Sequence, residues 1–248
     1  MLNGTASISL VRPTKSTDSA ALEQIPRGTA YGEAVVSPAS GDGLDVFLNE
    51  GSYFTAMPSG YVPGTGIIGP VQTTFSDTSA VLMLRNNAAI SGSPIGVRVD
   101  NIKLIVTAPG TAMTSLRFVG VVDSATRWVT PGGTALTFQP AAGLGSAVSS
   151  ITSGVFGALT IGAATGAKRF VNQAFARSVA TVAGDTFILR PSPAASASAS
   201  IGTATAIVVT LPMVPVIIPP GMVYILHTFS AAISAGITFE PVVSVIER

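Results

Sequence analysis

The sequence predicts an all-β protein, a jelly-roll-like β-sandwich with an extended N-terminal arm, in a chain of 248 residues. Short runs rich in β-branched residues recur along the chain, and Gly, Pro and Asn turn formers separate them every roughly 8 to 15 residues. No long stretch has the spacing of an amphipathic helix. We assign residues 1–40 to the arm and residues 41–248 to a single domain.

About ten short strands are expected. The clearest, 96–107, alternates apolar and polar residues but changes phase at Asp100-Asn101, which indicates a β-bulge. Residues 141–166 are rich in Ala, Gly and Ser, so we expect either a surface loop or flat strands packed closely on a neighbour. The other expected strands are 44–48, 52–56, 80–85, 115–123, 186–190, 204–211, 222–229 and 237–246.

The strand expected at 222–229 follows Pro219-Pro220-Gly221, in which Pro220-Gly221 suits the centre of a type II turn. Both of its faces are mostly apolar, so we expect it to be central, or buried on one side by a partner subunit. Pro241 cannot donate a backbone hydrogen bond, which predicts an edge or bulged position for the last strand. One face carries Met222, Tyr224, Leu226 and Thr228, and the other carries Val223, Ile225, His227 and Phe229.

The composition predicts burial against other subunits. Charged residues make up 10% of the chain, against about 25% in typical soluble domains, and large apolar surfaces usually mark interfaces. A net charge of +1 gives no general attraction to nucleic acid, so we expect no nucleic-acid partner. The chain has no cysteine, which excludes disulfides and cysteine-ligated metals.

We expect neither a signal peptide nor a membrane partner. The first ten residues contain no basic residue and no continuous apolar core. The most apolar uncharged window, 206–221, contains four prolines, and each would break a membrane helix.

No catalytic, cofactor-binding or metal-binding residue is predicted, and we expect no enzyme and no cofactor. His227 is the only histidine, whereas zinc sites need several such ligands and a triad base needs a nucleophile beside it. The segment 64–69 fits G-x-G-x-x-G but lacks a βαβ context. The remaining hypothesis for His227 is titration near neutral pH that couples assembly to pH.

Two stretches together resemble a family of virion structural proteins of tailed bacteriophages. They are Arg127–Thr137 and Ile218–His227, the latter leading to the terminal Glu247-Arg248. The segments 3–10 and 31–33 fit the same family. The resemblance implies a capsid-associated or tail-associated role and carries over no functional residues.

We therefore expect a decoration or cement protein that is made in the host cytoplasm and lies on the capsid surface. Its expected partners are the major capsid protein and other copies of itself, in a homotrimer, and the arm is expected to reach a neighbouring subunit. Candidate residues for the oligomer or capsid interface are Tyr224, Leu226, His227, Phe229, Lys168, Arg169 and Arg177.

Three alternatives stay open. One is a tail-fibre or spike receptor-binding module, which exposed aromatics at loop tips, such as Tyr53, Tyr61 and Trp128, would support. The second is a capsid protein of single-jelly-roll type. The third is a secreted hydrolase, which needs distant carboxylates to meet in one cleft.

Overall fold

The computed structural model describes residues 27–28, 34–35, 51–89, 95–129, 131–141, 149, 151–162, 168–191, 196–197 and 205–247. The chain divides into two units, Met1–Glu50 and Gly51–Arg248. In the first unit, β1 (Arg27–Gly28) pairs antiparallel with β2 (Ala34–Val35). The rest of the predicted arm lies outside the described residues, as does the strand expected at 44–48.

The second unit is all-β. Its described residues form a 14-stranded sheet, with one 3-10 turn, η1 (Ala125–Arg127). Nothing in the described ranges is a helix with the length and apolar character needed to span a bilayer. The strands are β3 (Tyr53–Pro58), β4 (Ile67–Ile68), β5 (Ser79–Asn86), β6 (Val97–Ala108), β7 (Thr114–Ser124), β8 (Thr134–Pro140), β9 (Thr152–Thr160), β10 (Arg169–Arg177), β11 (Thr186–Pro191), β12 (Ser196–Ala197), β13 (Val208–Met213), β14 (Val216–Ile218), β15 (Met222–Ala231) and β16 (Thr238–Glu247).

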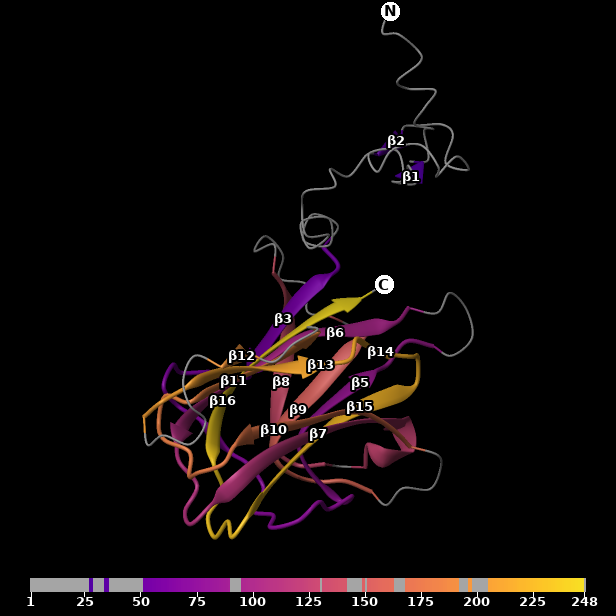
Figure 1. Cartoon of the computed structure of the whole chain (residues 1–248). Helices are drawn as coiled ribbons and strands as arrows, with labels where there is room; N and C mark the ends of the chain where they lie inside the picture. The colour runs from indigo at the N-terminus through magenta and orange to yellow at the C-terminus, as the bar shows by residue number, and fades with distance from the viewer. Residues whose placement is uncertain are drawn as a thin grey trace, which may run out of the picture. The chain divides into compact units, whose positions relative to one another are not determined.

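The sheet curls into a nearly closed barrel (Figure 1). Its order is β10-β7-β15-β5-β9-β8-β3-β16-β6-β11-β13-β12, with β14 on β6 and β4 on β16. Phe118 of β7 and Phe187 of β11 come from opposite ends of this path, yet their ring centroids lie 5.7 Å apart. The all-β prediction is confirmed. The pairing runs through one continuous sheet, and the two-sheet arrangement of a jelly-roll sandwich is not confirmed.

The interior is filled by side chains from nearly every strand. Phe239 of β16 lies 6.5 Å from Phe118 and 6.4 Å from Phe156 of β9, measured between ring centroids. Tyr224 and Leu226 of β15 join this main core, while Val223 and Ile225 on the other face join a smaller core. β15 pairs with both β5 and β7. The central position predicted for this strand is therefore confirmed, and residues of the same chain cover its outer face.

Two local predictions are confirmed by hydrogen bonds and register. The Met222 amide donates to the Pro219 carbonyl at 3.1 Å, and Gly221 has φ +69°, as a type II turn requires. In the β6–β16 ladder, Asn101 faces Ser244 and Val99 faces Val245. Asp100 is therefore the extra residue of a bulge, at the position where the sequence pattern changes phase.

Pro241 predicted an edge or bulged position for the last strand. The edge position is wrong for the strand as a whole, and the two register shifts of the β6–β16 ladder lie at Thr238/Phe239 and Ser244/Val245 rather than at Pro241. β16 lies between β6 on one side and β3 and β4 on the other. However, β4 faces only Thr238 and Phe239, and β3 faces residues 243–246. Pro241 falls in the gap between them, so a missing donor is tolerated there.

Glycines explain why the sequence pattern did not resolve β9 within residues 141–166. A Cβ at Gly154 would lie 3.0 Å from side-chain carbons of both Leu84 and Phe138, closer than ordinary contact. Gly157 has φ +133°, a backbone conformation that favours glycine. Close packing on the core, rather than loop formation, therefore accounts for these small residues, in line with the second expectation for this stretch.

A buried ion pair ties the two ends of the sheet together. Arg177 at the end of β10 and Asp185 just before β11 are fully buried and form a salt bridge. Asp185 also accepts hydrogen bonds from the Val182 amide at 2.9 Å and the Ile207 amide at 3.0 Å. Arg177 donates to the Thr205 carbonyl at 3.2 Å. The connection that closes the barrel is thus held by charge-assisted hydrogen bonds in the interior.

Proline explains why the ladder does not close completely between β10 and β13, which lie side by side. The Thr186 amide of β11 donates to the Ile207 carbonyl at 2.8 Å, so odd-numbered residues of this segment face β11. The even-numbered Pro212 therefore turns its nitrogen away from β11, on the edge of β13 where β12 pairs with Val209 and Thr210, and that nitrogen carries no hydrogen. We call the space between β10 and β13 the seam.

Breaking the buried pair should destabilise the barrel more than removing both charges. We expect Arg177→Met or Asp185→Leu to lower the free energy of unfolding by about 3–5 kcal/mol, because each leaves an uncompensated buried charge. The double variant should lose less than the two single variants combined. Urea unfolding measures all three, with Arg169→Met as the exposed control. Single variants that unfold like the control would contradict this role.

Candidate functional site

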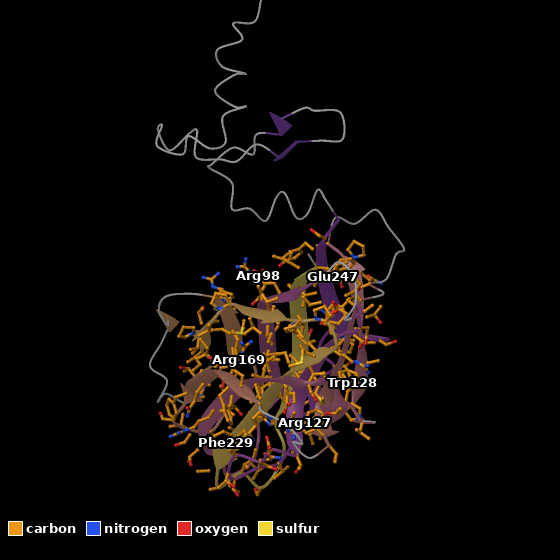
Figure 2. All side chains as sticks on the ribbon, turned by 90° about the vertical axis from the view of Figure 1, so that its right-hand side faces the viewer. Arg98, Arg127, Trp128, Arg169, Phe229 and Glu247 are labelled. Carbon is orange, nitrogen blue, oxygen red and sulfur yellow. The ribbon has the colours of Figure 1, made fainter. Side chains whose placement is uncertain are left out.

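Aromatic and basic side chains gather on the outer face of β15, β7 and β10. Two rows of register run across these strands: Phe229, Arg117 and Phe175 in one, and His227, Val119 and Gln173 in the next. Phe75, from the segment before β5, packs over these two rows. Its ring centroid lies 6.3 Å from that of Phe229 and 5.8 Å from that of Phe170. We call Phe75, Phe170, Phe175 and Phe229, with Lys168 and Arg117, the aromatic patch; Figure 2 labels Phe229.

Two bulges decide which β10 side chains reach this patch. The register with β7 shifts between Phe170 and Asn172 and again between Phe175 and Arg177. The first shift brings Phe170 to the same face as Gln173 and Phe175, although strict alternation would separate them. The second shift turns Arg177 inward. Phe170 is 55% exposed and Phe175 41% exposed, so the bulges produce an outward aromatic pair.

Cations lie over the exposed rings. The Lys168 ammonium is 5.8 Å from the centre of the Phe75 ring and 5.4 Å from that of Phe170. The Arg117 guanidinium lies 5.8 Å from the centre of the Phe175 ring. Such cation–π contacts stabilise by about 0.5–1 kcal/mol at exposed sites. They also hold the positive charges at the surface of the patch, where an anionic group of a partner can meet them.

A cluster of ion pairs lies beside the patch and connects the segments that carry its side chains. Arg127, labelled in Figure 2, is buried beside two carboxylates: Asp77 at 3.2 Å and Asp123 at 3.4 Å. Lys168 binds the second carboxylate oxygen of Asp77 at 2.7 Å. Two cations therefore face two anions, and the cluster carries no net charge. Asp77 connects the segment that carries Phe75 to the start of β10.

His227 lies under Phe75 as a neutral ring. Its Nδ1 is 2.7 Å from the Ser79 carbonyl oxygen, and because a carbonyl only accepts, the proton is on Nδ1. Its Nε2 is buried and has no hydrogen-bond partner within the described ranges. The Phe75 ring packs edge-on at 4.9 Å between centroids. No hydroxyl of the described residues bonds to Nε2, so this histidine lacks the nucleophile that a catalytic base activates.

Burial and neighbouring charges set the protonation of this cluster. Burial lowers the pKa of His227, and Arg127 and Lys168 lower it further, against the opposing effects of the Ser79 hydrogen bond and Asp77. For Asp77, burial acts to raise the pKa, but the Lys168 hydrogen bond and the charge of Arg127 outweigh it and lower the pKa overall. The histidine is thus held neutral and the aspartate ionised.

The predicted interface residues divide between the two faces of the sheet. His227, Phe229 and Lys168 come together at the aromatic patch, with His227 buried beneath it. Arg169 pairs with Val122, so it starts on the opposite face of β10 from Phe170. Tyr224 and Leu226 are fully buried in the main core. Arg177 is also fully buried, so its selection as a residue of an outer interface is corrected. The cause is the bulge between Phe175 and Arg177, which apolar periodicity does not reveal.

Sequence reasoning missed Phe75, Asp77 and Arg127 as parts of this site. They come from the segment before β5 and from η1, far along the chain from Lys168. The segment 70–78 has no strand or helix pattern that would place it over β15. One sequence signal could have indicated the cluster. A buried cation such as Arg127 requires a carboxylate partner, so Asp residues were the candidates to search.

No group of three or more potential metal-ligating side chains occurs in the part of the chain that the structure describes. Comparison with protein-family models, with curated proteins and with solved structures found no match for this chain. The chemistry of the site therefore has to be inferred from its own geometry. It consists of exposed aromatic rings and surface cations above a cluster of ion pairs. This arrangement suits binding to another molecule.

Stability should fall on mild acidification because of His227. A folded-state pKa below the unfolded value, about 6.5, means that the unfolded chain takes up the proton more readily. The stabilisation is present above that value and is lost as the pH falls toward the lowered folded-state pKa. We expect urea unfolding to show a decrease in stability between pH 7 and pH 5.

The matched variant is His227→Gln, which keeps an amide donor for the Ser79 carbonyl but does not titrate. Its stability should change less than that of the wild type over the same pH range, because no other histidine is present. Equal pH dependence of the two proteins would show that His227 does not cause it.

Proposed function

We propose that this protein is a structural component of a virus particle, a decoration or cement protein that binds the capsid surface of a tailed bacteriophage. The observation that carries the proposal is the aromatic patch, in which Phe170 and Phe175 are exposed beside Lys168 and Arg117. Aromatic side chains and arginine are enriched at the centres of protein interfaces. The resemblance to virion structural proteins is the reason for proposing a virus particle, and the aromatic patch is the surface proposed to attach to it.

The distribution of charge supports binding rather than catalysis. Asp77, Asp123 and Asp185 are all engaged in ion pairs with Arg127, Lys168 or Arg177. They are fixed by structural partners, so they are poorly placed to act as the free acid and base of a hydrolase. We therefore propose a protein that stabilises an assembly by interface burial, at about 25 cal/mol for each Å² of apolar surface removed from water.

A homotrimer is proposed as the bound form, with the major capsid protein as the second partner. Further apolar side chains are exposed away from the patch, which gives the barrel more than one surface for contacts: Val62, Ile68, Val129, Val214 and Ile217. The jelly-roll arrangement stays a prediction. The observed barrel also offers rigid outer faces to which partner subunits can bind. Residues 1–40 are proposed to reach a neighbouring subunit.

A receptor-binding module is the second candidate function. A cleft of about 480 Å³ lies between β3 and β8, lined in part by Met57, Tyr61, Thr137 and Gln139. An aromatic ring beside hydroxyl and amide groups suits a glycan. Tyr53 is not free for such a role, because its hydroxyl donates to Asp100 at 3.0 Å. Trp128 packs on the smaller core. Binding to host cells but not to shells would favour this candidate.

Loss of the exposed aromatic pair should weaken attachment. We expect the Phe170→Ser, Phe175→Ser double variant to bind emptied phage shells more weakly by on the order of tenfold or more, as truncation of interface hot spots does. Co-sedimentation measures the affinity, and light scattering measures the oligomeric state. The Met57→Ser, Val71→Ser double variant, at exposed apolar side chains outside the surfaces proposed for shell or subunit contacts, is the matched control. A wild-type protein that ignores shells would refute the proposed function.

Deletion of residues 1–40 tests the arm separately. If the arm reaches a neighbouring subunit, the shortened protein should assemble or attach less well while its barrel keeps the same thermal midpoint. Co-sedimentation and a thermal melt on the same preparation give both quantities. Unchanged attachment would remove the arm from the mechanism and leave the patch as the proposed contact.

A further inference from the structure

The seam between β10 and β13 is a groove with two unlike walls. Its volume is about 650 Å³, within the range of roughly 300–1,000 Å³ that ligand sites occupy. Val171, Asn172 and Gln173 of β10 form one wall. The other wall consists of Pro191, Pro212, Met213, Val214 and Pro215.

The β10 wall offers hydrogen-bonding groups. β10 is the terminal strand of the described sheet, paired only with β7, so the backbone groups of its outer edge are not used by a ladder. Asn172 is 9% exposed. Its Nδ2 makes no hydrogen bond of normal geometry within the described ranges, although the Tyr224 hydroxyl interacts with this side chain. A buried donor without a well-placed acceptor is destabilising. Asn172 lines the groove, so an acceptor placed there would relieve this.

Gly120 of β7 makes room for this arrangement. A Cβ at Gly120 would lie 2.7 Å from the Tyr224 hydroxyl oxygen and 3.2 Å from the Asn172 Cβ. Tyr224 and Asn172 therefore pack together over a glycine, with the Tyr224 hydroxyl within 3.8 Å of the Met213 sulfur. The amide is positioned by packing, as a recognition group needs to be.

The β13 wall is apolar and cannot complete the sheet. Pro212 turns a nitrogen without hydrogen away from β11, as described above, and Pro191 and Pro215 likewise lack donors. Val214 is 61% exposed. This wall can pack on apolar side chains but competes little for the hydrogen bonds of β10. The two walls together fit an extended peptide that pairs with one strand edge and rests its side chains on the other wall.

Charge identifies the kind of peptide. Arg169 and Arg190, both exposed, adjoin the groove in sequence, and no carboxylate lines it. An acidic segment is complementary to these cations. A second copy presenting the same edge would bring its own arginines, and like charges oppose such pairing. We propose that the seam binds an extended acidic peptide segment of a partner protein along the free edge of β10, with a peptide carbonyl accepting from Asn172 Nδ2.

The groove adjoins the aromatic patch along residues 171–173 of β10, but the proposal does not rest on a particle role. The test uses the purified full-length chain and a displayed library of short random peptides, with no shells present. Enriched peptides should alternate apolar residues and carry net negative charge. One synthetic enriched peptide then gives a dissociation constant by fluorescence anisotropy.

Three variants locate the binding. Asn172→Leu should weaken binding on the order of tenfold, since the peptide carbonyl loses its donor. Val214→Asp, at an exposed position, should weaken it by repelling the acidic peptide. Arg169→Ser with Arg190→Ser should weaken it and flatten its dependence on salt. Gln139→Leu and Arg98→Ser, exposed elsewhere, are the matched controls and should bind as the wild type does.

The overturning results are equally specific. Absence of any enriched peptide would refute the proposal, as would enrichment of neutral or basic sequences. Enriched peptides that bind Val214→Asp and Asn172→Leu as tightly as the wild type would place the site elsewhere. If Asn172→Leu fails to fold, Val214→Asp and the arginine pair still decide the question.

Discussion

The salt bridge between Arg177 and Asp185 is the interaction on which the closed shape depends. β10 and β11 are consecutive along the chain but lie at distant positions in the order of the sheet. The short connection between them therefore spans the opening of the barrel. Asp185 fixes that connection by accepting from both the Val182 and Ile207 amides. The Val106 and Ser115 amides also donate to carbonyls of this connection, so the ion pair acts together with backbone hydrogen bonds and the apolar core.

Register shifts explain how one sheet serves two purposes. A regular β10 would direct alternate residues outward, so Phe170 and Phe175 would lie on opposite faces. The register shift between Phe170 and Asn172 removes that conflict, and the shift between Phe175 and Arg177 turns Arg177 inward. The same strand then supplies aromatic rings to the outer surface and Arg177 to the interior. Bulges of this kind re-aim side chains at functional positions in many sheets, and here they separate attachment from closure.

The sequence predicted β6 and β15 well because their patterns are local. The phase change at Asp100 and the turn at Gly221 depend on neighbouring residues alone, and both were located correctly. β9 was ambiguous because Gly154 and Gly157 have no side chains, so the alternating pattern of a strand is not visible there. Their small size is required by close packing against the core. Arg177 was misplaced because its environment is determined by Asp185 and Thr205. The Phe75–His227 contact joins segments far apart in the chain, which periodicity cannot detect.

The proline at position 212 also has a consequence for behaviour at high concentration. Open strand edges are templates on which chains add one after another until fibres form. A strand that entered the seam would pair with β10, but it would meet a nitrogen without hydrogen at Pro212 on its far side. Addition at this place therefore ends after one strand. For a chain with so few charged residues to keep copies apart, this limit favours a finite complex over a growing fibre.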